Sequence, residues 1–140
     1  MIRFKMEELL NMKKGLLIGV LVLIVLVVSG SLIMLQKEKK EVNSLVYEII
    51  NMGEVADGYY EGEVSTTLIS VKVGVLVKDN NIEEIEIIKH DNGMGAKAEA
   101  IIDHMVKNNT YDVDVVSGAT FSSKVIKNAV NKALTKGINQ

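Results

Sequence analysis

The sequence predicts an α+β protein: an N-terminal transmembrane helix, then a small domain in which a mainly antiparallel sheet packs against two helices. Three observations predict this class. A long apolar run without charge lies near the N-terminus, two segments with alternating apolar residues follow it, and two later segments carry apolar residues at helical spacing. The resulting order of strands, helix, short strand and helix is typical of α+β domains.

Residues 15–35 form the apolar run, 21 residues without a charged side chain. At about 1.5 Å per residue, a helix of this length spans the hydrocarbon core of roughly 30 Å. A cleaved signal peptide is the alternative, because residues 28–31 include the small residues that a signal peptidase accepts. The run is longer than the ~7–15 residues of a signal peptide core, so we expect a retained anchor in contact with membrane lipid.

The flanking charges indicate the orientation of this anchor. Basic residues favour the cytoplasmic side of a membrane. Four precede the run and three follow it closely: Arg3, Lys5, Lys13 and Lys14, then Lys37, Lys39 and Lys40. We therefore expect a single-pass protein of the cell membrane, with residues 1–14 as a short cytoplasmic tail and the C-terminal domain extracytoplasmic.

A connector over residues 36–56 is expected between the anchor and a compact domain over residues 57–137. The charges of Lys37–Glu41 are typical of a solvated segment. The apolar residues that follow, Leu45, Val46, Ile49 and Ile50, have helical spacing and predict a short juxtamembrane helix.

The domain begins with a predicted hairpin. Apolar and polar residues alternate over 69–78, which is the period of a strand with one buried face. Asp79-Asn80-Asn81 predicts a turn, because Asp and Asn tolerate a left-handed backbone. Residues 82–88 then form a second, antiparallel strand.

The second half of the domain is predicted to be mostly helical. Apolar spacing predicts helices over 96–107 and 121–136, with Gly137 as the C-terminal cap of the second. Asp112–Val116 is expected to be a short strand between them.

Composition excludes several function classes. The chain has no cysteine, so it has no disulfide, thiolate nucleophile or cysteine-bound metal. The net charge of −2 gives no reason to expect a nucleic-acid partner, and two histidines are too few for a histidine-rich metal site. We predict neither catalytic residues nor a metal site.

A cluster of small and hydroxyl residues marks the junction before the last helix. Ser117-Gly118-Ala119-Thr120 leads directly into that helix, whose first N–H groups are unpaired and lie at the positive end of the helix dipole. With the hydroxyls of Ser122 and Ser123 and the ammonium of Lys124, the junction can hold a phosphate. Ordinary helix capping without any ligand is the alternative.

The junction and its surroundings resemble a known family. Asp114–Thr120 is similar to the flavinylation motif of the FMN-binding domain family, which includes flavin-carrying subunits of the sodium-translocating NADH:quinone reductase and of the Rnf complex. Asp57–Gly62 resembles the opening strand of that family, and the His90 loop with Gly93 and Gly95 occurs in the same order. The resemblance covers about residues 57–136.

The resemblance implies a covalent cofactor. In the family, a flavin transferase esterifies the last Thr of the motif to the phosphate of FMN, using FAD as donor, which places the attachment on Thr120. Asp114 is the acidic position of the motif, and Ser117, Gly118 and Ala119 shape the turn. His90 is a further candidate contact, although a loop histidine is more often a polar surface group.

These observations predict an electron carrier rather than an autonomous enzyme. Membrane-tethered FMN is expected to pass electrons between redox partner proteins at the outer membrane face. The alternative is a non-redox, membrane-anchored binding or adaptor module, in which Ser117–Thr120 is only a helix cap. The chain is shorter than the family members named above, so membership of their complexes does not follow.

Overall fold

The computed structural model describes residues 2–91 and 95–139. Gly93, which the resemblance includes, lies outside these residues. The chain divides into two compact units, residues 1–36 and residues 37–140. The division falls directly after the apolar run of residues 15–35.

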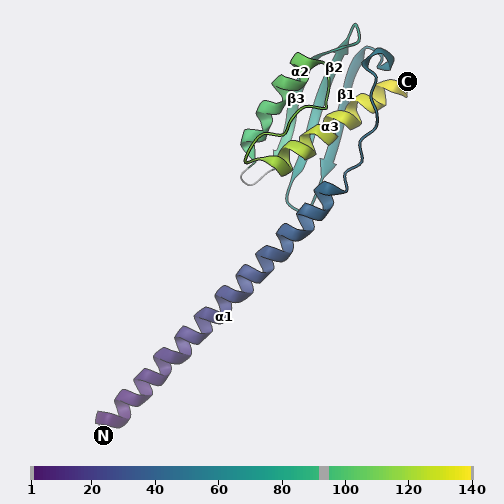
Figure 1. Ribbon diagram of the computed structural model, residues 1–140. Helices are drawn as coiled ribbons and strands as arrows, with labels where there is room; N and C mark the ends of the chain where they lie inside the picture. Colours follow the sequence, from purple (N-terminus) through teal and green to yellow (C-terminus); the bar gives the residue numbers. More distant parts are fainter. Residues whose placement is uncertain (1, 92–94, 140) are drawn as a thin grey trace. The chain divides into compact units, whose positions relative to one another are not determined.

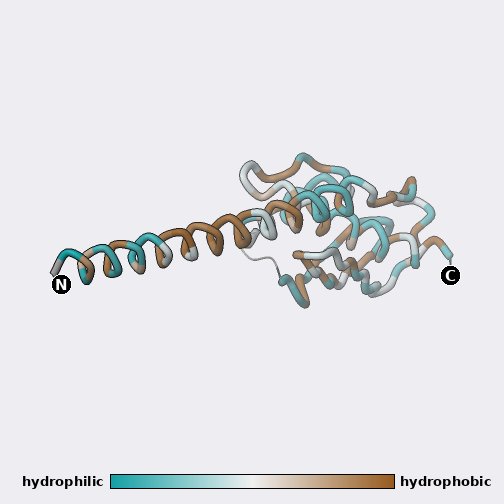
Figure 2. The backbone as a smooth tube through the Cα atoms, turned by 90° about the horizontal axis from the view of Figure 1, so that it is seen from below, coloured by the Kyte–Doolittle hydropathy of each residue, from teal (hydrophilic) through white to brown (hydrophobic). Residues whose placement is uncertain are grey.

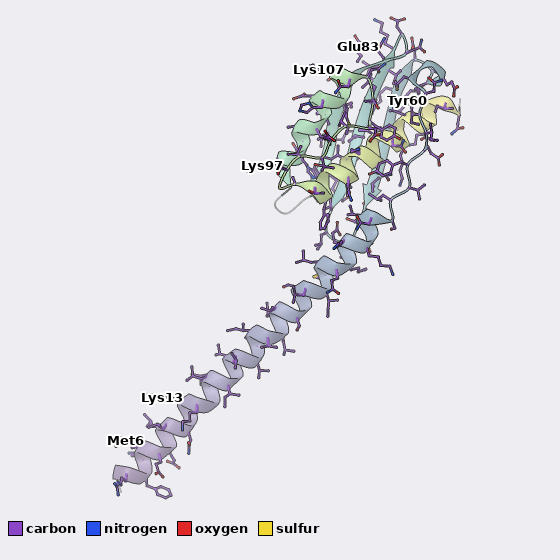
Figure 3. All side chains as sticks on the ribbon, in the orientation of Figure 1. Met6, Lys13, Tyr60, Glu83, Lys97 and Lys107 are labelled. Atoms are coloured by element: carbon purple, nitrogen blue, oxygen red, sulfur yellow. The ribbon has the colours of Figure 1, made fainter. Side chains whose placement is uncertain are left out.

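The first unit is helical. Helix α1 (Ile2–Asn43) is continuous over 42 residues and continues into the second unit. Figure 2 shows that the middle of α1 is hydrophobic, and Figure 3 shows side chains projecting on all sides of it, including those of Met6 and Lys13. The helix is long and apolar enough to cross a membrane, with a mean hydropathy of 3.0 in its most apolar part. The predicted long apolar helix is therefore confirmed.

The second unit contains a three-stranded antiparallel sheet. Its strands β1 (Gly58–Ser65), β2 (Ser70–Lys78) and β3 (Asn81–Asp91) lie in the order β1-β2-β3. The predicted hairpin is confirmed as β2 and β3, and both turn residues Asp79 and Asn80 have positive φ, at 50° and 61°. Alternate valines of β2 are buried and form the centre of the core.

Two helical segments cover the apolar face of the sheet (Figure 1). A 3₁₀ segment η2 (Ala96–Ala100) leads into α2 (Ile101–Asn108), which packs against β3. Helix α3 (Thr120–Ile138) packs across β1 and β2. Gly62 permits this approach, because a Cβ there would lie 1.9 Å from the carbonyl oxygen of Ala129. The α+β class is confirmed.

Three predicted local features are wrong. Asp112–Val116 is irregular rather than a strand. Residues 45–51, before the 3₁₀ segment η1 (Met52–Glu54), are irregular rather than helical, because side chains of α3 take up their backbone groups. Gly137 lies within α3 and is not its cap; a Cβ there would lie 2.6 Å from Val55, so the glycine serves close packing.

The charge run at the end of α1 is not fully solvated either. Glu38 is 1% exposed, and its carboxylate accepts hydrogen bonds from the Thr66 hydroxyl at 2.6 Å and the Leu68 N–H at 2.8 Å. Glu41 accepts from the N–H and the hydroxyl of Thr67. These carboxylates hold the β1–β2 turn, whose N–H groups need acceptors away from water.

Candidate functional site

The loop between α2 and α3 carries the predicted motif and is held by one lysine. The Lys127 side chain is 14% exposed. Its ammonium donates to the Asp112 carboxylate and the Val113 carbonyl, both at 2.8 Å. An ammonium with little solvent contact requires such partners. The first half of the loop is therefore fixed on α3.

A serine fixes the second half of the loop. Ser123 is fully buried, and its hydroxyl donates to the Ala119 carbonyl at 2.9 Å and accepts from the Val116 N–H at 3.0 Å. Ser122 is also buried, with 2% exposure. The structure therefore places both predicted phosphate-binding serines inside the domain, and the Ser123 hydroxyl is engaged by backbone.

A left-handed glycine turns the chain into α3. Gly118 has φ of +79°, a conformation that costs an L-residue roughly 1–2 kcal/mol. Nothing lies within 4 Å of a Cβ built at this position, so the constraint is conformational and not steric. Ser117 and Gly118 are both exposed. The turn thus stands at the surface of the domain.

Thr120 is the first residue of α3 and is exposed. The N-cap position is Ala119, which has no side chain capable of capping, and the structure shows no side-chain cap bond there. Within residues 2–91 and 95–139, the hydroxyls of Thr120 and Ser117 have no hydrogen-bond partner. The hydrogen bond that a simple side-chain cap would make is therefore not formed by Ser117 or Thr120.

Two open grooves flank the loop. The larger, of about 800 Å³, lies between α2 and the loop and is lined by both Asp114 and the exposed His104. The smaller, of about 370 Å³, is lined by Lys124 among others. Thr120 lines neither groove. Asp114 therefore lines a groove, whereas the Thr120 hydroxyl is exposed outside both grooves.

Lys124 points toward the end of α1. Its ammonium donates to the side-chain oxygen of Asn43 at 2.9 Å, and its carbonyl accepts from the Tyr47 hydroxyl at 2.9 Å. Tyr47 stacks on Tyr111 with ring centroids 5.9 Å apart. Burial, followed by the charges of Tyr111 and Asp112, raises the pKa of Tyr47 to about 12.

Sequence reasoning missed this stacked pair and the two buried asparagines beneath it. Asn128 donates to the Val46 carbonyl at 2.6 Å, and Asn131 bonds both backbone groups of Glu48. Both asparagines are 1% exposed. By helical spacing both asparagines lie on the face of α3 opposite its apolar stripe, so no local pattern indicated their burial; the segment of residues 46–48 covers that face and supplies the hydrogen-bond partners that buried amides need.

His90 lies near the end of β3, and its ring is buried rather than on an exposed loop. Its side chain is 2% exposed, and Nδ1 lies 2.8 Å from a carboxylate oxygen of Glu99 in η2. Helix α3 packs against η2, and Figure 1 shows the start of α3 close to it. The expectation of a polar surface group is wrong for the His90 ring. No hydrogen bond or ion pair joins His90 to Thr120 among the described residues.

Comparison with known proteins identifies the domain. Residues 67–135 match the family model for the FMN-binding domain. The match includes β2, β3, α2, the loop and Thr120. This domain therefore belongs to the FMN-binding domain family, which indicates a flavin-binding protein. A comparison with curated proteins found no match.

Proposed function

We propose that this protein is a membrane-anchored electron-transfer flavoprotein that carries FMN through a phosphoester to Thr120. The observation that carries the proposal is the Thr120 hydroxyl, exposed and without a hydrogen-bond partner in the described chain, inside a matched FMN-binding domain. An acceptor hydroxyl must be reachable by the enzyme that modifies it, and this one is.

The surrounding residues position the hydroxyl. Ser123 ties Val116 to Ala119, and Gly118 supplies the left-handed turn that brings Thr120 to the first position of α3. The phosphodiester keeps one negative charge, which the helix N-terminus stabilises by about 0.3–1 kcal/mol. Ser122, Ser123 and Lys124 then contribute through the shape of the turn instead of direct phosphate contacts.

Attachment requires a flavin transferase and FAD. The Thr120 oxygen forms a bond to the FMN phosphorus of FAD, the pyrophosphate bond breaks, and AMP leaves while the hydroxyl proton is released. Asp114 is exposed on the wall of the larger groove, four residues before Gly118. We assign it to recognition by the transferase, because its carboxylate has no ion-pair partner within the described residues.

The anchor determines where the flavin works. The charge bias around α1 favours a cytoplasmic N-terminus, which leaves the domain at the outer membrane face. Bound FMN supplies one- and two-electron chemistry, and the protein supplies its attachment and surroundings. An exposed attachment point suits exchange with redox partner proteins better than turnover of a small substrate in an enclosed pocket.

The experiment is co-expression of the full chain with a flavin transferase and an FAD supply. The intact mass should rise by one FMN less one water, on a peptide containing Thr120, and the denatured band should fluoresce. Thr120→Ala should abolish the adduct while Ser117→Ala retains it, since both hydroxyls are exposed and only one is the acceptor. A folded, colourless wild-type protein beside an active transferase would reject the proposal in favour of a non-redox binding module.

A further inference from the structure

A third groove lies away from the motif, between β3 and α2. It has a volume of about 350 Å³, and the half-buried or buried apolar side chains of Ile85, Ile102 and Val106 line it. Three acidic residues, Glu83, Glu84 and Asp103, and one basic residue, Lys107, lie at its border. Figure 3 shows Glu83 and Lys107 at the same end of the domain. The groove is therefore apolar within and negative at its border.

The strand beside this groove has a free edge. In the described chain β3 pairs with β2 alone. At Ile82 the side-chain oxygen of Asn109 accepts the backbone N–H at 2.8 Å, so an amide already occupies a position that a partner strand would take. The opposite edge differs, because Lys136 donates to the Glu61 carbonyl of β1 at 2.6 Å. The edge at β3 adjoins the apolar groove.

Two irregularities limit where a partner strand can pair. The register of β2 and β3 shifts between Leu76 and Val77 and again between Lys72 and Val73, which leaves Glu84–Ile87 as a regular stretch. Bulges and charges on an edge strand discourage indiscriminate pairing. The glutamates on this edge disfavour pairing with acidic strands and with a second copy of the same edge. A strand that carries positive side chains is attracted to it.

The two faces of this stretch have different chemistry. Glu84 and Glu86 lie opposite Leu76 and Gly74 on β2. The ring of Tyr59 covers Gly74, and burial, followed by the charges of Glu86 and Glu61, raises the pKa of Tyr59. These glutamates therefore share the outer face of the sheet, and neither joins an ion pair in the described chain. The inner face leads into the apolar groove.

We propose that the groove between β3 and α2 binds an extended segment of a partner protein in which apolar residues alternate with Lys or Arg. Successive side chains of a strand point to opposite faces. A segment paired with Glu84–Ile87 places its apolar side chains over Ile85, Ile102 and Val106 and its basic side chains beside Glu84 and Glu86. Main-chain hydrogen bonds then supply affinity and the alternation supplies specificity. This docking does not depend on the flavin.

Calorimetric titration of the full chain in a zwitterionic detergent tests the proposal. The probe is an eight-residue peptide that alternates valine and lysine; the control peptide has the same composition in two blocks. The alternating peptide should bind at least about tenfold more tightly than the block peptide, and Glu84→Lys/Glu86→Lys should weaken it by about tenfold or more. Glu54→Lys/Asp57→Lys makes the same charge change before β1 and should leave affinity within about twofold.

Three binding results would each overturn the proposal. They are failure of the alternating peptide to bind at millimolar concentration, equal affinity for the block peptide, and equal affinity of the Glu84→Lys/Glu86→Lys variant. Amide NMR shifts locate the complex independently. The largest shift changes on peptide binding should fall on residues 84–87 and 102–106. Largest changes on residues 110–120 would show that the peptide does not bind in this groove.

Discussion

Glu38, near the end of α1, accepts a hydrogen bond from the backbone N–H of Leu68 at 2.8 Å, although 30 residues separate them in sequence. The same carboxylate accepts from the Thr66 hydroxyl. A buried carboxylate is stable only where hydrogen bonds replace its hydration. The last turns of α1 are consequently part of the folded domain and not a loose connector.

Glu38→Gln should destabilise the domain by about 1–3 kcal/mol, because the amide nitrogen of Gln cannot accept a hydrogen bond and one buried donor loses its acceptor. Lys39→Gln, at an exposed neighbouring position, should change stability by less than about 0.5 kcal/mol. Thermal unfolding of the full chain in detergent, followed by circular dichroism, measures both. Equal melting temperatures for the two variants would contradict the role of Glu38.

The neighbouring Glu41 predicts a pH dependence. Hydrogen bonds from the N–H and hydroxyl of Thr67, with the charge of Lys37, lower the pKa of Glu41. A lowered folded-state pKa stabilises the fold above the unfolded-state pKa, and this contribution is lost as pH falls through the folded-state value. Glu41→Gln should therefore flatten the acid side of the stability profile. If the stability of the variant falls with decreasing pH as steeply as that of the wild type, other groups cause this pH dependence.

Local sequence patterns predicted the regular elements well, and the failures share a physical cause. Alternation in β2 and helical spacing in α3 are visible within a short window because each element buries one face. Residues 45–51 and 112–116 are also apolar or alternating, yet their partners are the side chains of Asn128, Asn131 and Lys127. A window of sequence does not contain such distant partners.

The same cause limited the prediction of the site. The position of Thr120 at the start of α3 follows from the Ser-Gly-Ala-Thr pattern. The burial of Ser122 and Ser123 depends on which side of α3 faces the sheet and which faces the loop. Likewise, the ammonium of Lys124 is drawn to Asn43, whose position depends on the path of the end of α1.

Two glycines should respond differently to substitution by alanine. Gly62→Ala places a methyl group 1.9 Å from the Ala129 carbonyl oxygen, so α3 must move, and overpacking of this kind typically costs about 1–3 kcal/mol. Gly118→Ala places its methyl group in open space, so it costs only the strain of a φ of +79°, about 1–2 kcal/mol. Thermal unfolding should rank Gly62→Ala as the more damaging. The reverse order would show that α3 adjusts easily at β1.

Protease treatment of intact cells tests the orientation of α1. A protease site placed between the domain and a C-terminal tag avoids reliance on the irregular segment after α1, whose backbone is held by Asn128 and Asn131. External protease should remove a C-terminal tag and leave an N-terminal tag intact, because the charge bias keeps the N-terminus inside. Loss of the N-terminal tag with protection of the C-terminal one would reverse the assignment. Lysed cells, in which both tags are cut, provide the control.

Ser123→Ala tests whether the turn must be held for flavin attachment. The change removes the acceptor of the Val116 N–H and the donor to the Ala119 carbonyl, both on the chain that leads to Thr120. We expect slower flavin incorporation at limiting transferase and a loss of about 1–3 kcal/mol of stability. Ser117→Ala is the matched control, because Ser117 is exposed and its hydroxyl has no partner in the described chain.

The result also separates positioning from phosphate binding. If Ser123 acts through the loop, a longer reaction or more transferase should restore full incorporation, and the finished adduct should keep the wild-type flavin spectrum. A spectrum that shifts in Ser123→Ala would instead place its hydroxyl on the cofactor, which its burial and its two backbone bonds oppose. Incorporation at the wild-type rate, together with the expected loss of stability, would show that the transferase does not need the turn preformed.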